Sequence, residues 1–169
     1  MVKDKQENQV LNRFFEGLCI LMALCLFVLP IFYYKSLPEK IPVHFDFYGF
    51  PDGYGSKSTL FLLASLGFSI YLIVLFAGLM NDKYYNISFK TTPVGKEKII
   101  SLVRIILKVL RINTLLIFNF SIIGIILISK GIINGLGSLS FIIVILMILA
   151  PIILMVVRMK NLANYSSKS

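Results

Sequence analysis

One polar stretch of this chain contains the residue types that could perform acid–base, metal or recognition chemistry. Residues 37–57, LPEKIPVHFDFYGFPDGYGSK, include the single histidine of the sequence, His44, together with Asp46 and Asp52. One imidazole and two carboxylates can ligate a divalent metal or exchange protons. The same side chains can also hold a turn or bind a partner. Which chemistry applies depends on how the surrounding chain positions these three residues.

Residues 41–48 alternate with the period of a β-strand. One face would hold Ile41, Val43, Phe45 and Phe47, and the other Pro42, His44, Asp46 and Tyr48. His44 and Asp46 would then lie roughly 6.6–7 Å apart along the strand. The sequence after Phe50 is typical of a type I turn, because Pro suits its second position and Gly its fourth. We predict a turn that returns Asp52 toward His44 and is built from Pro51, Asp52, Gly53 and Gly55.

Three interpretations of this stretch are open. In the first, Asp52 holds the turn and His44 makes a fixed hydrogen bond, so both residues are structural. In the second, the stretch is a ligand- or partner-binding face formed by His44, Asp46, Tyr48, Asp52, Tyr54 and Lys57. In the third, His44, Asp46 and Asp52 form a metal or acid–base site of an enzyme. Their spacing matches no closed zinc pattern, and we expect no metal and no cofactor.

Four apolar blocks near membrane-spanning length surround this stretch. The 169-residue chain is 57% hydrophobic and only 15% charged, whereas soluble domains have about 25% charged residues. Apolar runs of about 18 residues or more predict transmembrane helices. We therefore predict an all-α membrane protein with one integral domain over residues 1–169 and an ordered strand–turn loop, residues 37–57, between helices 1 and 2. The predicted helices lie at residues 14–34, 59–80, 112–129 and 139–157.

A basic amphipathic segment, residues 97–111, precedes the third predicted span. Arg104, Lys108 and Arg111 recur at intervals of three or four, so they share one helix face. Because each cation at mid-bilayer costs about 2.5–3.5 kcal/mol, we expect this stripe at the inner membrane surface. There its side chains would extend to the interface, bind anionic lipid or dock a cytosolic partner. Residues 97–129 could form one long helix or a bent pair.

The few other polar residues of the apolar blocks suggest helix contacts. Asn113 and Asn119 are predicted to hydrogen-bond across helices, as amides do within membranes. Glu16 lies about one turn inside the first block and is predicted to reach the cytosolic interface. Residues 130–137 contain three glycines and an asparagine, which predicts a tight connector between antiparallel helices.

The distribution of basic residues predicts the orientation. The N-terminal segment, residues 81–111 and the C-terminal tail hold 3, 7 and 3 Lys or Arg residues, and the other two connectors hold four. Because Lys and Arg concentrate on the cytosolic side, both termini should be cytosolic and residues 37–57 extracytoplasmic. The net charge of +9 then reflects membrane-flanking residues. No aromatic–basic interleaving typical of nucleic-acid binding is present, so we expect no nucleic-acid partner.

The motif LP-EK-IPVHF-DFYG-FPDGYGSK resembles a bacterial family of membrane domains of unknown function. It is similar to the domain at the N-terminus of SdpI-type immunity proteins, which protect a cell from a secreted killing factor and can relay its presence to a repressor. The matching positions are Leu37, Pro38, Ile41, Pro42, His44, Phe45, Gly49, Pro51, Asp52, Gly53, Gly55 and Lys57. The family pattern has Asn where this chain has Asp46, so the resemblance weakens a metal-ligand role for Asp46.

The leading hypothesis is a non-enzymatic protein of the bacterial cytoplasmic membrane whose outer loop binds or senses an extracytoplasmic peptide or protein, in an immunity- or signalling-like role. Membrane lipids and a cytosolic protein are the further expected partners. The alternative is a membrane enzyme or transport accessory that uses His44, Asp46 and Asp52 with a divalent metal.

Overall fold

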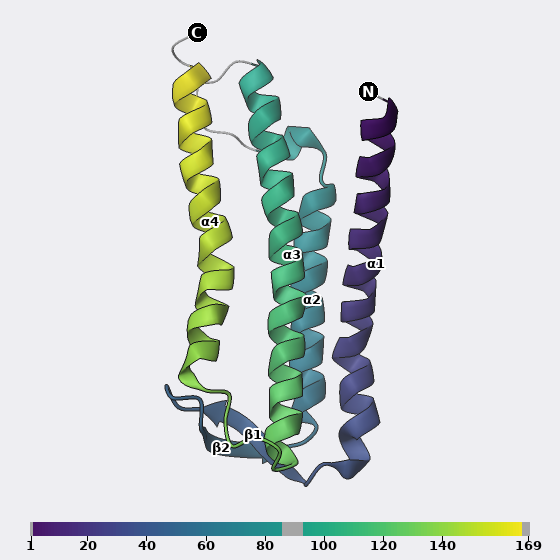
Figure 1. Ribbon diagram of the computed structural model, residues 1–169, viewed down its shortest axis with the longest axis vertical. Coiled ribbons are helices and arrows are strands. Elements are labelled where there is room, and N and C mark those ends of the chain that lie inside the picture. The colour runs from purple at the N-terminus through teal and green to yellow at the C-terminus, as the bar shows by residue number, and fades with distance from the viewer. Residues whose placement is uncertain (1, 86–92, 167–169) are drawn as a thin grey trace.

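The computed structural model describes residues 2–85 and 93–166, and within these ranges the chain forms four long helices and one β-hairpin (Figure 1). The helices are α1 (Val2–Tyr33), α2 (Thr59–Leu79), α3 (Pro93–Ser129) and α4 (Ser138–Ser166). The strands β1 (Lys40–Phe45) and β2 (Pro51–Ser56) lie between α1 and α2. Each of these helices contains an apolar stretch long enough to cross a membrane. The predicted class, helical and membrane-spanning with a hairpin after the first helix, is confirmed.

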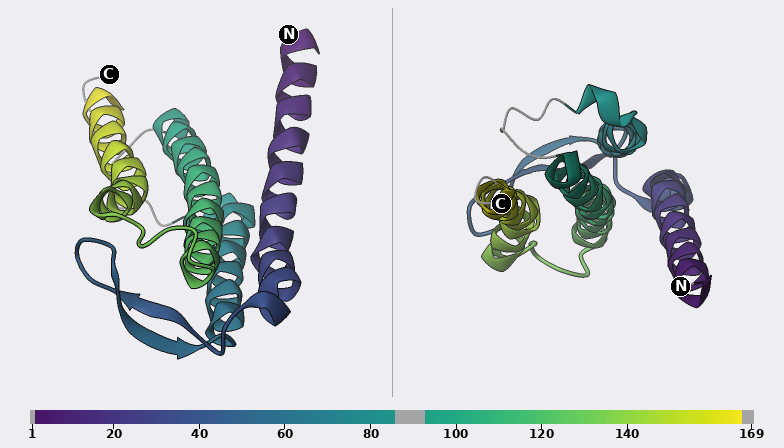
Figure 2. Two further views of the ribbon diagram at one scale, coloured as in Figure 1. Left: turned by 60° about the horizontal axis from the view of Figure 1, so that its bottom comes forward. Right: turned by 90° about the horizontal axis from the view of Figure 1, so that it is seen from above.

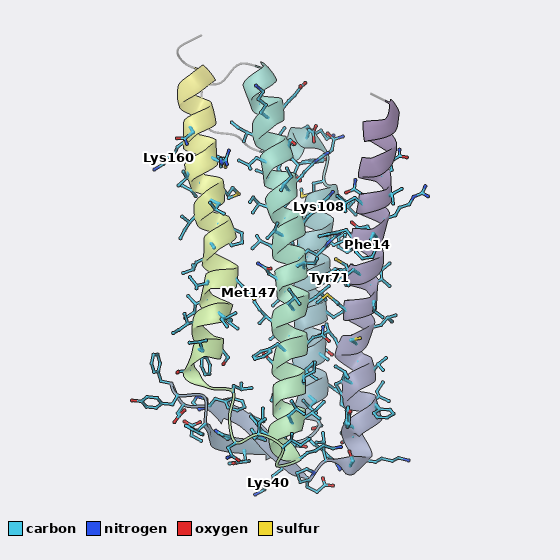
Figure 3. All side chains as sticks on the ribbon, viewed as in Figure 1. Phe14, Lys40, Tyr71, Lys108, Met147 and Lys160 are labelled. Atoms are coloured by element: carbon cyan, nitrogen blue, oxygen red, sulfur yellow. The ribbon has the colours of Figure 1, made fainter. Side chains whose placement is uncertain are left out.

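The two chain termini lie at one end of the bundle, and the hairpin lies across the opposite end (Figure 1). We call these the termini end and the hairpin end. Figure 3 places Lys40 at the hairpin end and both Lys108 and Lys160 toward the termini end. All three stretches predicted to be cytosolic therefore map to the end opposite the hairpin, as far as the described residues extend.

The helices extend beyond the apolar blocks at the termini end. α1 begins at Val2 rather than near residue 14, and α4 continues to Ser166. The polar segment before residue 14 contains Lys, Glu and Gln but no Pro or Gly, and these polar residues are good helix formers. Hydropathy therefore locates the predicted membrane span, and helix propensity carries the helix beyond it.

α3 is the central helix of the bundle and packs against α1, α2 and α4. It is one continuous helix of 37 residues, roughly 55 Å long at 1.5 Å per residue. Its proline, Pro93, occupies the first helical position, where the missing backbone donor is tolerated. Residues 97–111 and 112–129 therefore belong to one helix, which decides between the two arrangements left open by the sequence.

Apolar side chains from three helices form the core, with Leu26 of α1, Leu60 of α2 and Leu115 of α3 almost completely buried. α2 and α3 approach closely at Gly67. A Cβ atom at this position would lie 2.5 Å from Cγ of Phe118. Small residues permit this kind of close backbone approach in membrane helix pairs. The absent side chain of Gly67 thus makes room for the Phe118 ring.

Two asparagines connect α3 to its neighbours, as predicted. Asn113 Nδ2 donates to the carbonyl of Met147 in α4 at 2.6 Å, and Asn119 Nδ2 donates to the carbonyl of Met22 in α1 at 3.0 Å. Such bonds form between helices where water does not compete for the amide. They attach both outer helices to the central one.

α4 has the least contact with the rest of the bundle. In its most apolar window 6% of the residues are buried, compared with 22–28% in the other three helices. α4 packs mainly on α3, and the view along the bundle shows α4 and α1 on opposite sides of α3 (Figure 2). Most of its apolar side chains therefore face away from the protein.

Candidate functional site

The hairpin pairs β1 and β2 in antiparallel register, with Lys40 opposite Ser56 and Ile41 opposite Gly55. The register shifts on both sides of His44. A bulge of this kind interrupts the alternation of a strand and redirects side chains. The predicted alternation is therefore wrong within β1: Ile41 and Pro42 are both buried, and the next two side chains, Val43 and His44, are both exposed.

The chain reverses at residues 46–50, before the turn that the sequence predicted. Asp46 N donates to the Phe50 carbonyl at 2.9 Å, Gly49 N donates to the Asp46 carbonyl at 3.0 Å, and Phe50 N donates to Asp46 Oδ1 at 2.8 Å. Gly49 has φ of +85°, a conformation that glycine adopts without steric cost. The predicted turn is thus misplaced, since β2 contains Pro51, Asp52, Gly53 and Gly55.

Asp46 has a structural role at this turn. Its Oδ1 atom accepts the Phe50 amide, and Asp and Asn side chains stabilise turns in this way. An Asn side chain offers the same oxygen acceptor, which fits the Asn of the family pattern that the motif resembles. Asp46 therefore contributes to the shape of the hairpin rather than to a cluster with His44.

The hairpin is held on the bundle at both its base and its tip. At the base, Ile41 is buried in the core with the helices, and the pair of Lys57 Nζ and Glu39 Oε1, 2.9 Å apart, closes the two strands on each other. At the tip, Leu136 of the α3–α4 connector donates its amide to the Gly49 carbonyl at 2.8 Å. The Lys57 side chain is only 13% exposed. Of the predicted ligand-binding residues, Lys57 is thus placed in a structural ion pair.

His44 and Asp52 form an exposed pair across the two strands. His44 Nδ1 lies 2.5 Å from Asp52 Oδ1, and the side chains are 72% and 45% exposed. Gly53 permits the close approach of the two strands here, because a Cβ there would lie 2.9 Å from the Cβ atom of His44. Asp52 lies beside His44 as expected, but it belongs to strand β2 and not to a turn. Within the described part of the chain, no three His, Cys, Asp or Glu residues gather as a metal site would require.

Four aromatic side chains of the hairpin are exposed. Phe47, Tyr48 and Phe50 surround the turn, and we call them the aromatic tip; their exposures are 79%, 67% and 55%. Tyr54 of β2 is 61% exposed. Tyr48 and Tyr54 were predicted as binding residues, whereas Phe47 and Phe50 were not. The expected strand placed Phe47 on the apolar face. Gly49, which lies between Phe47 and Phe50 and has a positive φ, was the available signal for a turn at these residues.

A cavity of about 240 Å³ lies beneath the hairpin. Val43 and Phe45 of β1 line one part of it, and Leu63 of α2, Ser121 of α3 and Phe141 of α4 line others. The lining is almost entirely apolar. The site thus combines an exposed polar pair, exposed aromatic rings and an adjacent apolar cavity.

The predicted basic stripe lies at the other end of the molecule and has protein partners. Arg104 Nη2 lies 2.5 Å from Asp82 Oδ1, in the short helix Asp82–Tyr84. Lys108 Nζ donates to Asn12 Oδ1 at 2.8 Å, and Arg111 Nη2 donates to Glu16 Oε1 at 2.5 Å. The sequence did not predict these partners. The signal for one of them was Glu16, since an acid inside an apolar block requires compensation.

The comparisons with known proteins bear on the hairpin. Residues 21–68 match the family model described as Domain of unknown function (DUF1648). This segment runs from within α1 through the hairpin into α2, and the match confirms the predicted resemblance to a domain of unknown function. The comparisons with curated proteins and with solved structures find no match.

Proposed function

We propose that this protein is a multipass component of the bacterial cytoplasmic membrane whose hairpin binds an extracytoplasmic factor, in an immunity- or signalling-like role and without catalysis. The observation that carries the proposal is the exposed His44–Asp52 pair on a hairpin held in place by other contacts. The four apolar helices support the multipass architecture.

The fold has little need of this pair. Exposed ion pairs contribute about 0–1 kcal/mol to stability, and the strand ladder, the buried Ile41 and the Asp46 turn already fix the hairpin. Both side chains are thus available to a partner without loss of the hairpin. Because the backbone is already ordered, binding there costs little conformational entropy.

The neighbouring surface indicates the chemistry of the partner. Aromatic rings are enriched in protein interfaces and dominate their binding energy, and the aromatic tip exposes three of them beside the His44–Asp52 pair. The 240 Å³ cavity beneath β1 offers room for an apolar group. A peptide with apolar side chains and at least one polar or charged group fits this combination.

The orientation is part of the proposal, with the hairpin outside the cell and both termini in the cytosol. The excess of Lys and Arg in segments at the termini end supports it. Single cysteines can test it in a background in which Cys19 and Cys25 are replaced by Ala. A membrane-impermeant maleimide should label Tyr54→Cys in intact cells and Lys160→Cys only after lysis. The opposite pattern would refute the orientation.

A challenge experiment tests recognition directly. Cells that lack the gene, with and without a complementing copy, are exposed to the secreted products of sibling cells. We expect the wild-type copy to protect, and the His44→Asn/Asp52→Asn double variant to protect less at an equal membrane level. Lys40→Gln, also exposed on β1 but outside the pair, is the matched control and should protect fully. Full protection by the double variant would contradict the role assigned to the pair.

A further inference from the structure

A second cavity, of about 360 Å³, lies between α1, α2 and α3 toward the termini end. Its volume falls within the roughly 300–1,000 Å³ of small-molecule sites. Arg104, Lys108 and Arg111 of α3 line it together with Glu16 of α1. The remaining wall is largely apolar and includes Val74, Leu75, Leu79, Ile105 and Leu107. The cavity therefore has a cationic part and an apolar part.

Its cations are only partly neutralised by protein groups. Arg111 is paired with Glu16 and Arg104 with Asp82. Lys108 contacts the neutral amide of Asn12 and forms no ion pair within the described residues. The cavity thus retains one positive charge beyond its acidic partners.

Arg111 also has a donor without an acceptor. Its side chain is only 6% exposed, and its Nε atom is buried with no hydrogen-bond partner. Buried donors are almost always paired, so each exception requires an explanation. This atom has almost no accessible surface, so the cavity presents the charges of Arg104 and Lys108, and not Arg111 Nε, to a ligand.

The three basic residues share one helix face. They are spaced four and three residues apart, so they lie above one another along α3. Both views of Figure 2 show the N-terminal part of α1 diverging from α2 and α3. An amphiphile in the membrane can approach the cavity from that side, with its charged group toward the termini end.

We infer that this cavity binds the phosphate group of an anionic phospholipid from the leaflet at the termini end. Lys108 Nζ and the half-exposed guanidinium of Arg104 contact phosphate oxygens, and the apolar wall of α2 contacts the start of an acyl chain. A free phosphate ion would leave that apolar wall without a partner, which favours a lipid. This site is independent of recognition at the hairpin.

Native mass spectrometry of the detergent-purified full chain can test the site with phosphatidylglycerol and phosphatidylcholine of equal chain length. We expect one phosphatidylglycerol to remain bound, and phosphatidylcholine to dissociate. Lys108→Gln should weaken phosphatidylglycerol binding about tenfold, the effect of losing one charged hydrogen bond. Arg158→Gln is the matched control, because it removes an exposed charge of α4 that does not line the cavity.

Glu16→Gln separates a lipid site from a purely structural ion pair. It removes a negative charge from the wall of the cavity, so phosphatidylglycerol should bind more tightly, whereas a structural pair predicts no gain. Soluble glycerol phosphate in excess should fail to displace the lipid; displacement would assign the site to soluble phosphates instead. Equal retention of both lipids, or equal weakening by Lys108→Gln and Arg158→Gln, would overturn the inference.

Discussion

The two ends of the molecule each contain a close pair of polar side chains, but in contrasting environments. At the hairpin end, His44 Nδ1 and Asp52 Oδ1 lie 2.5 Å apart on side chains that are 72% and 45% exposed. At the termini end, Arg111 Nη2 and Glu16 Oε1 are also 2.5 Å apart, but the Arg111 side chain is only 6% exposed, while that of Glu16 is 45% exposed. An equal distance therefore does not imply an equal role.

The contrast follows from solvation. When an exposed pair forms, each side chain exchanges contacts with water for contacts with its partner, so the net gain in stability is small. A buried pair gains little relative to apolar residues, but removing one partner leaves an uncompensated charge and is costly. The hairpin end is thus fixed by backbone bonds, apolar contacts, the Asp46 turn and the Lys57–Glu39 pair, which leave His44 and Asp52 available. At the termini end, polar side chains of α3 themselves join the helices.

The largest effect should come from the buried pair. Arg111→Met should lower the free energy of unfolding by about 1–3 kcal/mol, because it leaves the half-exposed Glu16 without its partner inside the apolar segment. Unfolding in mixed micelles with increasing denaturing detergent measures it. The Glu16→Leu/Arg111→Met double variant is the control and should regain most of the loss. Equal destabilisation by both variants would show that the charge pair is not the cause.

The tip of the hairpin should be the next most sensitive point. At Gly49, a Cβ atom would lie 2.5 Å from the backbone nitrogen of Gly137, and the positive φ alone costs about 1–2 kcal/mol for other residues. Gly49→Ala should therefore speed amide hydrogen exchange throughout β1 and β2. Gly131→Ala is the matched control, because Gly131 also has positive φ but has no atom within 4 Å of such a Cβ. Equal effects of the two variants would show that the close approach of Gly49 to Gly137 does not stabilise the hairpin.

The turn itself offers a smaller test. Asp46→Ala removes the acceptor of the Phe50 amide and should destabilise the hairpin by about 1 kcal/mol. Asp46→Asn retains an oxygen acceptor and should change little. Exchange of the Phe50 amide reports both variants. If Asp46→Asn were as harmful as Asp46→Ala, the negative charge and not the hydrogen bond would be required.

The sequence predicted the elements of both ends better than their contacts. The four apolar blocks predicted the membrane spans, because hydropathy is a local property of the sequence. The motif predicted a loop that contains a strand. The position of the turn was missed because Pro51-Asp52-Gly53 favours a turn locally, whereas the observed turn depends on the docking of Gly49 against the distant residues Leu136 and Gly137. The sequence of residues 37–57 alone does not predict where the α3–α4 connector lies.

The basic stripe shows the same limit. Helical periodicity correctly put Arg104, Lys108 and Arg111 on one face, but it cannot say which neighbour that face meets. The partner of Arg111 is 95 residues away in the sequence. The sequence predicted that Glu16 reaches the cytosolic interface. That prediction took account of the cost of an isolated charge, but not of an opposite charge that another helix could supply.

The smallest effect on stability should come from the exposed pair, and this prediction tests the comparison most sharply. His44→Asn should change the free energy of unfolding by less than about 1 kcal/mol, because the pair is exposed and the strand ladder remains. Detergent-induced unfolding measures it beside Arg111→Met. A loss as large as that of Arg111→Met would make His44 a structural residue, and the recognition proposal would lose its support. A small loss combined with reduced protection in the challenge experiment would separate the two ends, because His44→Asn would then impair binding with little effect on stability.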